Sequence, residues 1–387
     1  MENNVSAMLM KILGCALCGT ECDPVLFSSL SAEMIGKLYT LSKAHDLAHA
    51  VYDVLEGQAC MEDSEIASKF KKQKAIATYR YAGIQCELES VYALLEKARI
   101  PYMPLKGSVI RDYYPNPEMR TSSDIDILIH ENDLEHAVAL FRDELSYSVG
   151  LKSTHDISLF SPGGIHVELH FSLSENDPTL DAVLLTAWDL ARVEEGYSYR
   201  FRMSNEMFFV YCLSHMAKHF VGGGCGIRPF MDLWIIEHKM GYDSKKAAEL
   251  LSRCRLTKFA QQAEELTKVW FAGGEHSALT GEMEEYILGG GVFGKTENKI
   301  AIASTKQGGR LRYALGRIFL SFDILKLYYP NLEKHPVLYP CYLVKRWFRV
   351  LFGKNRKNAI EELKKTATVE GAKKKKLSAL CKNLELI

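Results

Sequence analysis

The sequence lacks any apolar run of about 18 residues, so it predicts no segment that spans a bilayer. It also lacks an excess of either charge, because 48 lysines and arginines balance 48 aspartates and glutamates. No overall field therefore draws the chain to long nucleic acid or to an anionic membrane, and any anion site must be local. The N-terminus lacks a secretory pattern, since Glu2 precedes any positive charge and Lys11 interrupts the first apolar run. We expect a cytoplasmic protein.

The ten cysteines lack the paired spacing of a metal-binding module. Cys15 and Cys18 form one C-x-x-C, but no second pair follows, so the pattern for zinc or redox chemistry is incomplete. The spacing of Cys15, Cys18 and Cys22 also fits one face of a helix. We expect buried thiols, as in a large protein of a reducing compartment.

The order of helical and strand patterns along the chain predicts an α+β protein with a small mixed sheet flanked by helical regions. Its 387 residues, 47% of them hydrophobic, suffice for a full core and for two or three domains, and no internal repeat is present. Residues 64–99 read as one long amphipathic helix, and residues 156–171 read as a hairpin that turns at Ser161–Gly164. The predicted division is a helical region at 1–100, a compact α/β core at 101–175, a helical region at 176–350 and a basic helical tail at 351–387.

Two aspartates share one face of a mostly apolar strand in the segment "SSDIDILI". Side chains alternate along a strand, so Asp124 and Asp126 project together, opposite the isoleucines of the same run. Two neighbouring carboxylates repel, and one pKa rises unless a cation holds both ionised. A divalent metal such as Mg²⁺ does this with carboxylate oxygens. The alternative is a D-x-D that only makes an exposed strand face polar.

Two further segments carry chemistry that suits such a metal. The strand "MPL" ends in Lys106-Gly107-Ser108 before the helix-like "VIRDYY", which predicts a phosphate cradle of close backbone and unpaired helix amides. In "GGIHVELHF" the residues His166, Glu168 and His170 alternate with an apolar face. Glu168 therefore offers a third carboxylate, either as a metal ligand or as the base for an attacking hydroxyl.

These motifs resemble the uncharacterised nucleotidyltransferase family of the DNA polymerase β-like superfamily. The resemblance rests on LKG, on Arg120 13 residues after the glycine, on SDIDIL and on VELH. The general layout covers residues 30–350, while the specific motifs lie within 101–175. The resemblance assigns a nucleotide-binding turn to Gly107 and Ser108, metal ligands to Asp124 and Asp126, the third acid to Glu168, and positions typical of the narrower family to Lys106, Arg120 and His170. One departure is the interval of 17 residues from Gly107 to Asp124, where the superfamily has about a dozen. The insertion "YYPNPEMR" carries Arg120, whose guanidinium suits a triphosphate oxygen.

The resemblance implies transfer of a nucleotidyl group from an NTP to an acceptor hydroxyl, with Mg²⁺ or Mn²⁺ as cofactor. One metal would neutralise the phosphates of the leaving group and a second would activate the acceptor. Small molecule, RNA end and protein side chain all remain open as acceptors. The alternative is a non-catalytic protein that binds nucleotide or a partner on the same scaffold, against which the three converging acids argue.

Four further features are candidates with alternatives. His215 and His219 at i and i+4 suit a metal, a substrate or a packed helix pair. The loop Val221–Gly226 closes over a nucleotide or simply connects two helices. Arg228 and Asp232, at i and i+4, form a pair that bridges within one helix. The segment "YPCYLVKRWFRVLFG" touches a membrane surface or RNA, or forms part of a helical core, and we favour the core.

Overall fold

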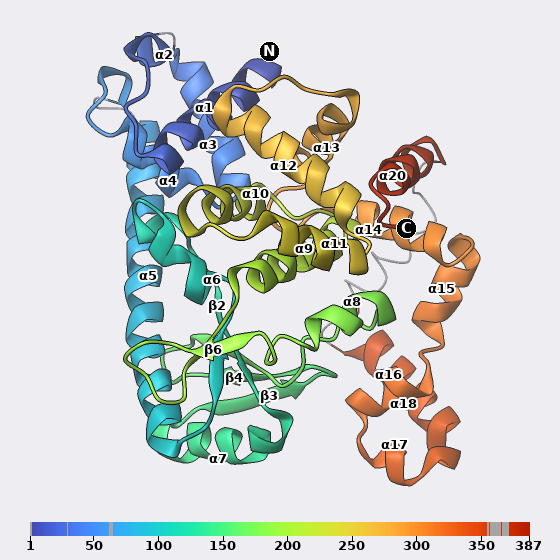
Figure 1. The fold of residues 1–387 in the computed structure, drawn as a ribbon. Coiled ribbons are helices and arrows are strands. Elements are labelled where there is room, and N and C mark those ends of the chain that lie inside the picture. Colours follow the sequence, from blue (N-terminus) through green and yellow to red (C-terminus); the bar gives the residue numbers. More distant parts are fainter. Residues whose placement is uncertain (1, 29, 62–64, 354–355, 357–364, 366–370) are drawn as a thin grey trace. The chain divides into compact units, whose positions relative to one another are not determined.

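The computed structural model describes the chain except for residues 1, 29, 62–64, 354–355, 357–364 and 366–370 (Figure 1). The chain folds into two compact units, each of which is described by itself. Unit 1 comprises Met1–Met216 and Gly226–Val292, and unit 2 comprises Ala217–Cys225 and Phe293–Ile387. The division of the sequence into four functional regions stays a prediction.

Unit 1 contains a five-stranded mixed sheet in the order β1-β2-β5-β4-β3. Its strands are β1 (Tyr102–Pro104), β2 (Asp124–Ile129), β3 (Ser148–Lys152), β4 (Asp156–Phe160) and β5 (His166–His170). Strands β2 and β5 pair in parallel, while the other neighbours pair antiparallel. The fold class is α+β as predicted, and the hairpin of β4 and β5 around Ser161–Gly164 is confirmed.

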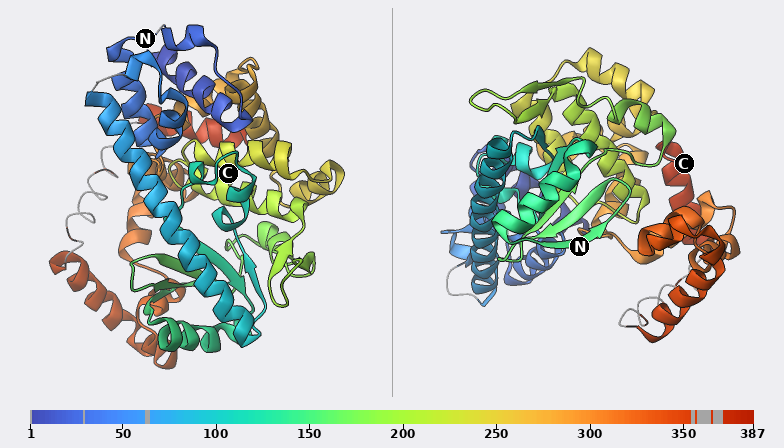
Figure 2. Two further views of the ribbon diagram at one scale, coloured as in Figure 1. Left: turned by 90° about the vertical axis from the view of Figure 1, so that its left-hand side faces the viewer. Right: turned by 90° about the horizontal axis from the view of Figure 1, so that it is seen from below.

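One face of this sheet is covered by α5 (Glu65–Ala98) and α7 (Leu134–Leu145), which share a hydrophobic core with it. Figure 2 shows α5 running across the strands in its left-hand view. Ile125, Ile127 and Ile129 of β2 are fully buried on this face. Each buried isoleucine contributes about 1.5–3 kcal/mol, and a slip of one residue would place the aspartates in the hydrophobic core instead. The hydrophobic alternation therefore fixes the acids on the opposite face.

The long helix α5 confirms the predicted helix at 64–99 almost to the residue. Its buried positions, among them Leu88, Val91 and Leu95, recur at helical spacing toward the sheet. The helix stops where Arg99 adopts a left-handed conformation with φ 58°, and the Ile100 N–H donates to the Leu95 carbonyl at 3.0 Å. This turn directs the chain into β1.

The remaining helices of unit 1 precede, interrupt or follow the strands along the chain. Those on the N-terminal side are α1 (Glu2–Cys18), α2 (Pro24–Ser28), α3 (Ala32–Ala44), α4 (Ala48–Leu55) and the 3₁₀ turn η1 (Ala59–Met61). Between the strands lie α6 (Gly107–Ile110), η2 (Arg111–Tyr113), η3 (Pro117–Met119) and η4 (Glu131–Asp133). After the sheet follow α8 (Pro178–Leu184), α9 (Asn205–Val221), α10 (Arg228–Ile235), η5 (Ile236–Met240), α11 (Ser244–Arg253), α12 (Thr257–Ala272) and α13 (Ala278–Leu288). The last residues of α9 belong to unit 2.

The predicted helical region at 176–350 also contains two strands. A second small sheet pairs β6 (Ala191–Val193) with β7 (Phe201–Met203). Each strand has three residues, which is too short for a periodic pattern to reveal it. Within the same region Arg255 has a left-handed φ of 55° and separates α11 from α12.

Unit 2 is helical over its described residues. Its helices are α14 (Thr296–Lys306), α15 (Arg310–Ile318), α16 (Phe322–Tyr328), α17 (Asn331–Lys334), η6 (Pro336–Leu338), α18 (Tyr339–Phe352) and α20 (Gly371–Asn383). The described end of the predicted basic tail is the helix α20, which carries Lys373–Lys376, while most of residues 354–370 lie outside the described part. No helix among the described residues has the length and apolar character needed to cross a membrane.

The expectation of three buried thiols near the N-terminus is wrong. Cys15 and Cys22 form a disulfide with Cα atoms 5.7 Å apart, and Cys18 is an exposed free thiol. Cys15 lies near the end of α1 and Cys22 lies in the loop that follows it, so the chain reverses to bring the two together. Disulfides are rare in reducing compartments, so this pair does not support the cytoplasmic prediction, which remains untested.

Candidate active site

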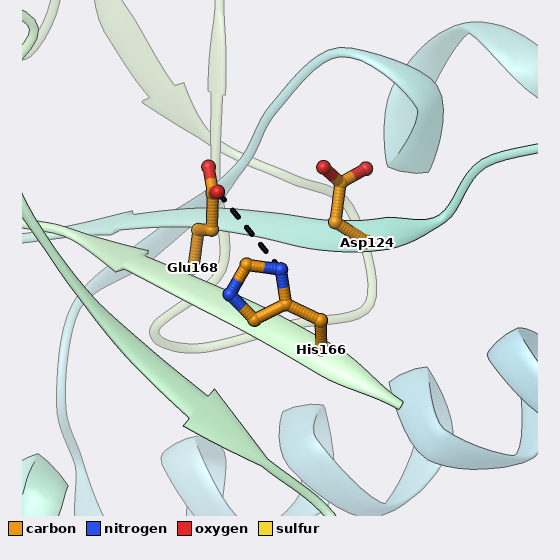
Figure 3. Close-up of side chains that lie close together, drawn as sticks. All are labelled: Asp124, His166 and Glu168. Atoms are coloured by element: carbon orange, nitrogen blue, oxygen red, sulfur yellow. Dashed lines mark ion pairs between the residues drawn. The ribbon is translucent and has the colours of Figure 1, made fainter. Parts of the chain in front are cut away.

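The parallel register of β2 and β5 brings the predicted acids together on the face of the sheet opposite α5 and α7. Asp124 lies opposite His166, and Asp126 lies opposite Glu168. Two sets of donor atoms lie within 4.8 Å of one another: Asp124, His166 and Glu168, and Asp126, Glu168 and His170. Figure 3 shows the first set, with the Asp124 and Glu168 carboxylates projecting from neighbouring strands beside the His166 ring. Glu168 is common to both sets.

Asp126 is neutralised by the chain itself. Its Oδ1 accepts hydrogen bonds from Lys106 Nζ at 2.8 Å and from His170 Nε2 at 3.0 Å, and its side chain is 5% exposed. Burial alone would raise the pKa of Asp126, but Lys106 and His170 hold that pKa far below its usual range. This carboxylate therefore stays ionised without a metal.

Both cations at Asp126 stay protonated near neutral pH. Burial alone would lower the pKa of His170, but hydrogen bonds to Asp126 and Glu168 raise that pKa to about 9. Burial would likewise lower the pKa of Lys106, and the negative charge of Asp126 more than offsets it, so that pKa is raised. His170 Nε2 also lies 3.5 Å from Glu168 Oε2.

The backbone at Lys106 is strained. Its φ of 45° and ψ of −120° place a residue with a Cβ in a region that L-residues rarely occupy. Two contacts hold it there, because its side chain pairs with Asp126 and the preceding Leu105 N–H donates to the Asp126 carbonyl at 3.0 Å. The turn Lys106–Ser108 is thus fastened to β2 beside the donor atoms.

Asp124 differs from Asp126 because no hydrogen bond or ion pair to it exists among the described residues. Burial first, and the charge of Asp126 second, raise the pKa of Asp124 to about 6. Repulsion between the two neighbouring carboxylates of the D-x-D predicts such a raised pKa for one of them. Asp124 is therefore the acid that an external cation would favour most.

The Cα atom of Gly107 is packed closely against protein atoms, and nucleotide binding by Lys106–Ser108 stays a prediction. A Cβ on Gly107 would lie 2.4 Å from Ser122 Oγ, which accepts a hydrogen bond from the buried Arg111 at 2.9 Å. The Ser108 N–H donates to the Leu105 carbonyl and the Val109 N–H to the Lys106 carbonyl, both at 3.1 Å. These two helix amides are thus not the free donors that the sequence predicted.

Arg120 is engaged in an ion pair with Asp232. Its Nε donates to both carboxylate oxygens of Asp232, at 2.7 and 3.0 Å, and its side chain is 12% exposed. Arg228 in turn donates to Asp46 Oδ2 at 2.7 Å. The ion pairs of Arg228 and Asp232 therefore join distant segments rather than neighbouring turns of α10. A contact of Arg120 with a triphosphate stays a prediction.

The remaining sequence candidates do not join the donor atoms. His215 and His219 lie on α9 and are absent from both donor sets of the described residues. The loop Val221–Gly226 is packed rather than open, since the Gly223 carbonyl accepts from the Lys295 N–H at 3.0 Å and from Asn298 at 3.2 Å. Closure of this loop over a nucleotide is not supported by that packing.

Sequence reasoning placed His166 on the correct face but gave it no role. The register alone decides this, because His166 meets Asp124 only when β2 and β5 run parallel. The sequence gives no role to Ser122 and the wrong partner to Asp232 for the same kind of reason, since Arg111 and Arg120 come from other segments of the chain. The strand alternation of "GGIHVELHF" was the one available signal for His166.

Comparison with known proteins gives one match. A family model described as uncharacterised nucleotidyltransferase matches residues 31–272, a range that includes the sheet and every donor residue above. No curated protein and no solved structure matches the chain.

We predict that Lys106→Met lowers the free energy of unfolding by about 3 kcal/mol, because it leaves a buried carboxylate with half of its cationic partners. Met preserves the length of the side chain and the backbone strain, so the change isolates the charge. Chemical denaturation measures the effect. Lys37→Met is the matched control, since Lys37 pairs with Glu33 at 2.5 Å on the exposed face of α3 and should leave stability almost unchanged. Equal effects of the two variants would contradict the prediction.

We predict that Gly107→Ala lowers the free energy of unfolding by about 1–3 kcal/mol through its clash with Ser122 Oγ. Gly36→Ala in α3 is the control, because a Cβ there meets nothing within 4 Å. In a Ser122→Ala background the penalty of Gly107→Ala should shrink, and a double-mutant cycle measures this. Additive effects would show that Gly107 is required for another reason.

Proposed function

Because the chain belongs to the uncharacterised nucleotidyltransferase family, we propose that it transfers a nucleotidyl group from an NTP to an acceptor hydroxyl with a divalent metal. The observation that carries the proposal is the set Asp124, His166 and Glu168, whose donor atoms lie within 4.8 Å of one another. It stands beside a turn that carries the cation Lys106. A metal site next to a cationic turn suits a triphosphate.

The residues of this set fit a metal ion. His166 Nδ1 lies 3.9 Å from Glu168 Oε1, and the Asp124 carboxylate has no hydrogen bond or ion pair among the described residues. One imidazole and two carboxylates suit Mn²⁺ at least as well as Mg²⁺, which prefers oxygen alone. When bound, such a metal supplies charge neutralisation for the phosphates and activation of the acceptor hydroxyl.

The charges around Asp126 support the roles that we propose for the remaining groups. Lys106 and His170 are protonated near neutral pH, so neither can accept the proton of the attacking hydroxyl. Asp126 is a poor base because the same two cations hold its pKa very low. Glu168 is the acid of the set that lies next to both Asp124 and Asp126, and we assign it proton acceptance in addition to metal binding.

The substrates follow from this chemistry only by class. An NTP is the donor that the family implies, and Lys106 is the candidate contact for its phosphates. The acceptor is a hydroxyl on a small molecule, an RNA end or a protein side chain. The donor set contains no group that selects among these three.

We predict that His166→Gln lowers the affinity for Mn²⁺ about tenfold and changes the affinity for Mg²⁺ much less, because it removes the nitrogen donor. Calorimetry with each metal alone measures both affinities. His276→Gln is the matched control, since His276 also pairs with a carboxylate, Glu284, at 3.0 Å but lies in neither donor set. A loss of Mg²⁺ affinity as large as that of Mn²⁺ would argue against a nitrogen ligand.

We predict that Mn²⁺ affinity depends on pH through Asp124, whose pKa is raised to about 6 in the absence of metal. Metal and proton compete for this carboxylate, so the affinity falls by up to about tenfold per pH unit below that value and levels off above it. Titrations across the range measure the slope. Asp124→Asn should bind weakly at every pH, and a pH dependence unchanged in that variant would contradict the assignment.

We predict that Glu168→Gln lowers turnover by a factor of about 10² or more while nucleotide binding persists in weakened form. Release of pyrophosphate is measured with all four NTPs and a cell extract as the source of acceptors. Glu284→Gln is the control with the same chemical change outside the donor sets. Binding of metal and nucleotide by the wild type, without pyrophosphate release above the Glu168→Gln background, would favour the non-catalytic alternative.

A further inference from the structure

The segment at residues 339–353, for which the sequence favoured a helical core, exposes one of its apolar faces. It forms α18, whose Leu343 is buried against α16 and α17. On another side, Val344, Phe348 and Phe352 are 43%, 60% and 77% exposed. Their spacing of four residues aligns them in one stripe along the helix. The core prediction is therefore correct for one face of α18 and wrong for the other.

A second row of exposed apolar side chains lies on α15 and on Phe319, the residue that follows it (Figure 1). Leu311, Leu315 and Phe319 follow at intervals of four and are 74%, 44% and 50% exposed. Trp347 of α18 links the two elements, since its Nε1 donates to the Ile318 carbonyl at 2.9 Å and its ring packs edge-on against Phe319. Isolated exposed apolar residues are ordinary, but two aligned stripes on linked helices mark an interaction surface.

Basic side chains border these stripes. Lys345 and Arg349 follow Val344 and Phe348 by one residue and form their own row along α18. Their charged ends stack on tyrosines, with Lys345 Nζ 5.6 Å and the Arg349 guanidinium 5.3 Å from the centre of the Tyr329 ring. Residues 310–353 hold eight lysines and arginines against Asp323 and Glu333. This local excess lies within a chain whose overall charge is zero.

From this combination we propose that α15 and α18 form a docking surface for an anionic lipid membrane. Helices with an apolar stripe bordered by Lys, Arg and aromatic residues lie in the plane of the interface, with the apolar side chains among the acyl chains. The basic row then meets the negative headgroups, whose attraction decays within a Debye length. The surface attaches unit 2 to the membrane without crossing it.

Two other occupants explain the surface less well. A second copy of the chain, paired through the same face, would bring two basic rows together, and like charges across an interface are unfavourable. Single-stranded RNA would use the aromatic rings for stacking, but the stripes also contain Leu311, Leu315 and Val344, which offer no stacking face. Lipid acyl chains accept both aliphatic and aromatic side chains.

The test is co-sedimentation of the full chain with phosphatidylcholine vesicles, with and without phosphatidylserine. We expect binding to the mixed vesicles that weakens as salt rises. Phe348→Glu combined with Phe352→Glu should lower the partition coefficient at least about tenfold, because both rings leave the apolar phase. Lys345→Gln combined with Arg349→Gln should weaken binding to the mixed vesicles and leave binding to pure phosphatidylcholine unchanged.

Tyr79→Glu is the matched control, because Tyr79 is an 84% exposed aromatic residue on α5 and belongs to neither stripe. Circular dichroism melting should match the wild type for every variant, since all changed side chains are exposed. Absence of wild-type binding to mixed vesicles, or equal binding by the phenylalanine variant, would overturn the proposal. So would a wild-type dimer that this variant converts to monomer, or RNA binding that it abolishes.

Discussion

The buried charges around Asp126 are the constraint on which the rest of the site depends. A buried carboxylate must be paired, and here one oxygen accepts from both Lys106 and His170. Because these partners come from the turn after β1 and from the end of β5, the pairing holds both of these segments against β2. It also decides which aspartate remains without a cation, and therefore where an external ion would gain most.

The sequence predicted the direction of side chains well and their partners poorly. Alternation along β2 and β5 is a local property, so the acidic face followed from a few residues of each strand. The pairing of Lys106 with Asp126 depends instead on a left-handed backbone that no pattern announces. Likewise, Arg228 and Asp232 have helical spacing, yet Arg228 pairs with Asp46, 182 residues away along the chain. Long-range partners require the tertiary fold.

The dependence on tertiary contacts also explains the two clearest errors of prediction, at the N-terminal cysteines and at α18. Helical spacing of Cys15, Cys18 and Cys22 indicated one buried face, but the helix ends at Cys18 and the loop returns Cys22 to Cys15. For α18 the periodicity identifies the apolar faces of the helix. It does not show which of these faces packs against another element. The small core around Leu343 buries one face only, which leaves the stripe containing Phe348 exposed. Burial is decided by what else packs nearby.

Asp124 shows why the site is not arranged for stability. Burial beside Asp126 without a partner raises its pKa to about 6, so its ionised form is unfavourable in the protein alone. The strained backbone at Lys106 adds a second unfavourable element within the same few ångströms. A cation bound at Asp124 would stabilise the ionised form of that carboxylate. It would not change the strained backbone at Lys106, whose ammonium would stay fixed beside the donor atoms. The two aspartates in "SDID" therefore differ in their surroundings: Asp126 is paired with two cations of the chain, while Asp124 has no hydrogen bond or ion pair among the described residues.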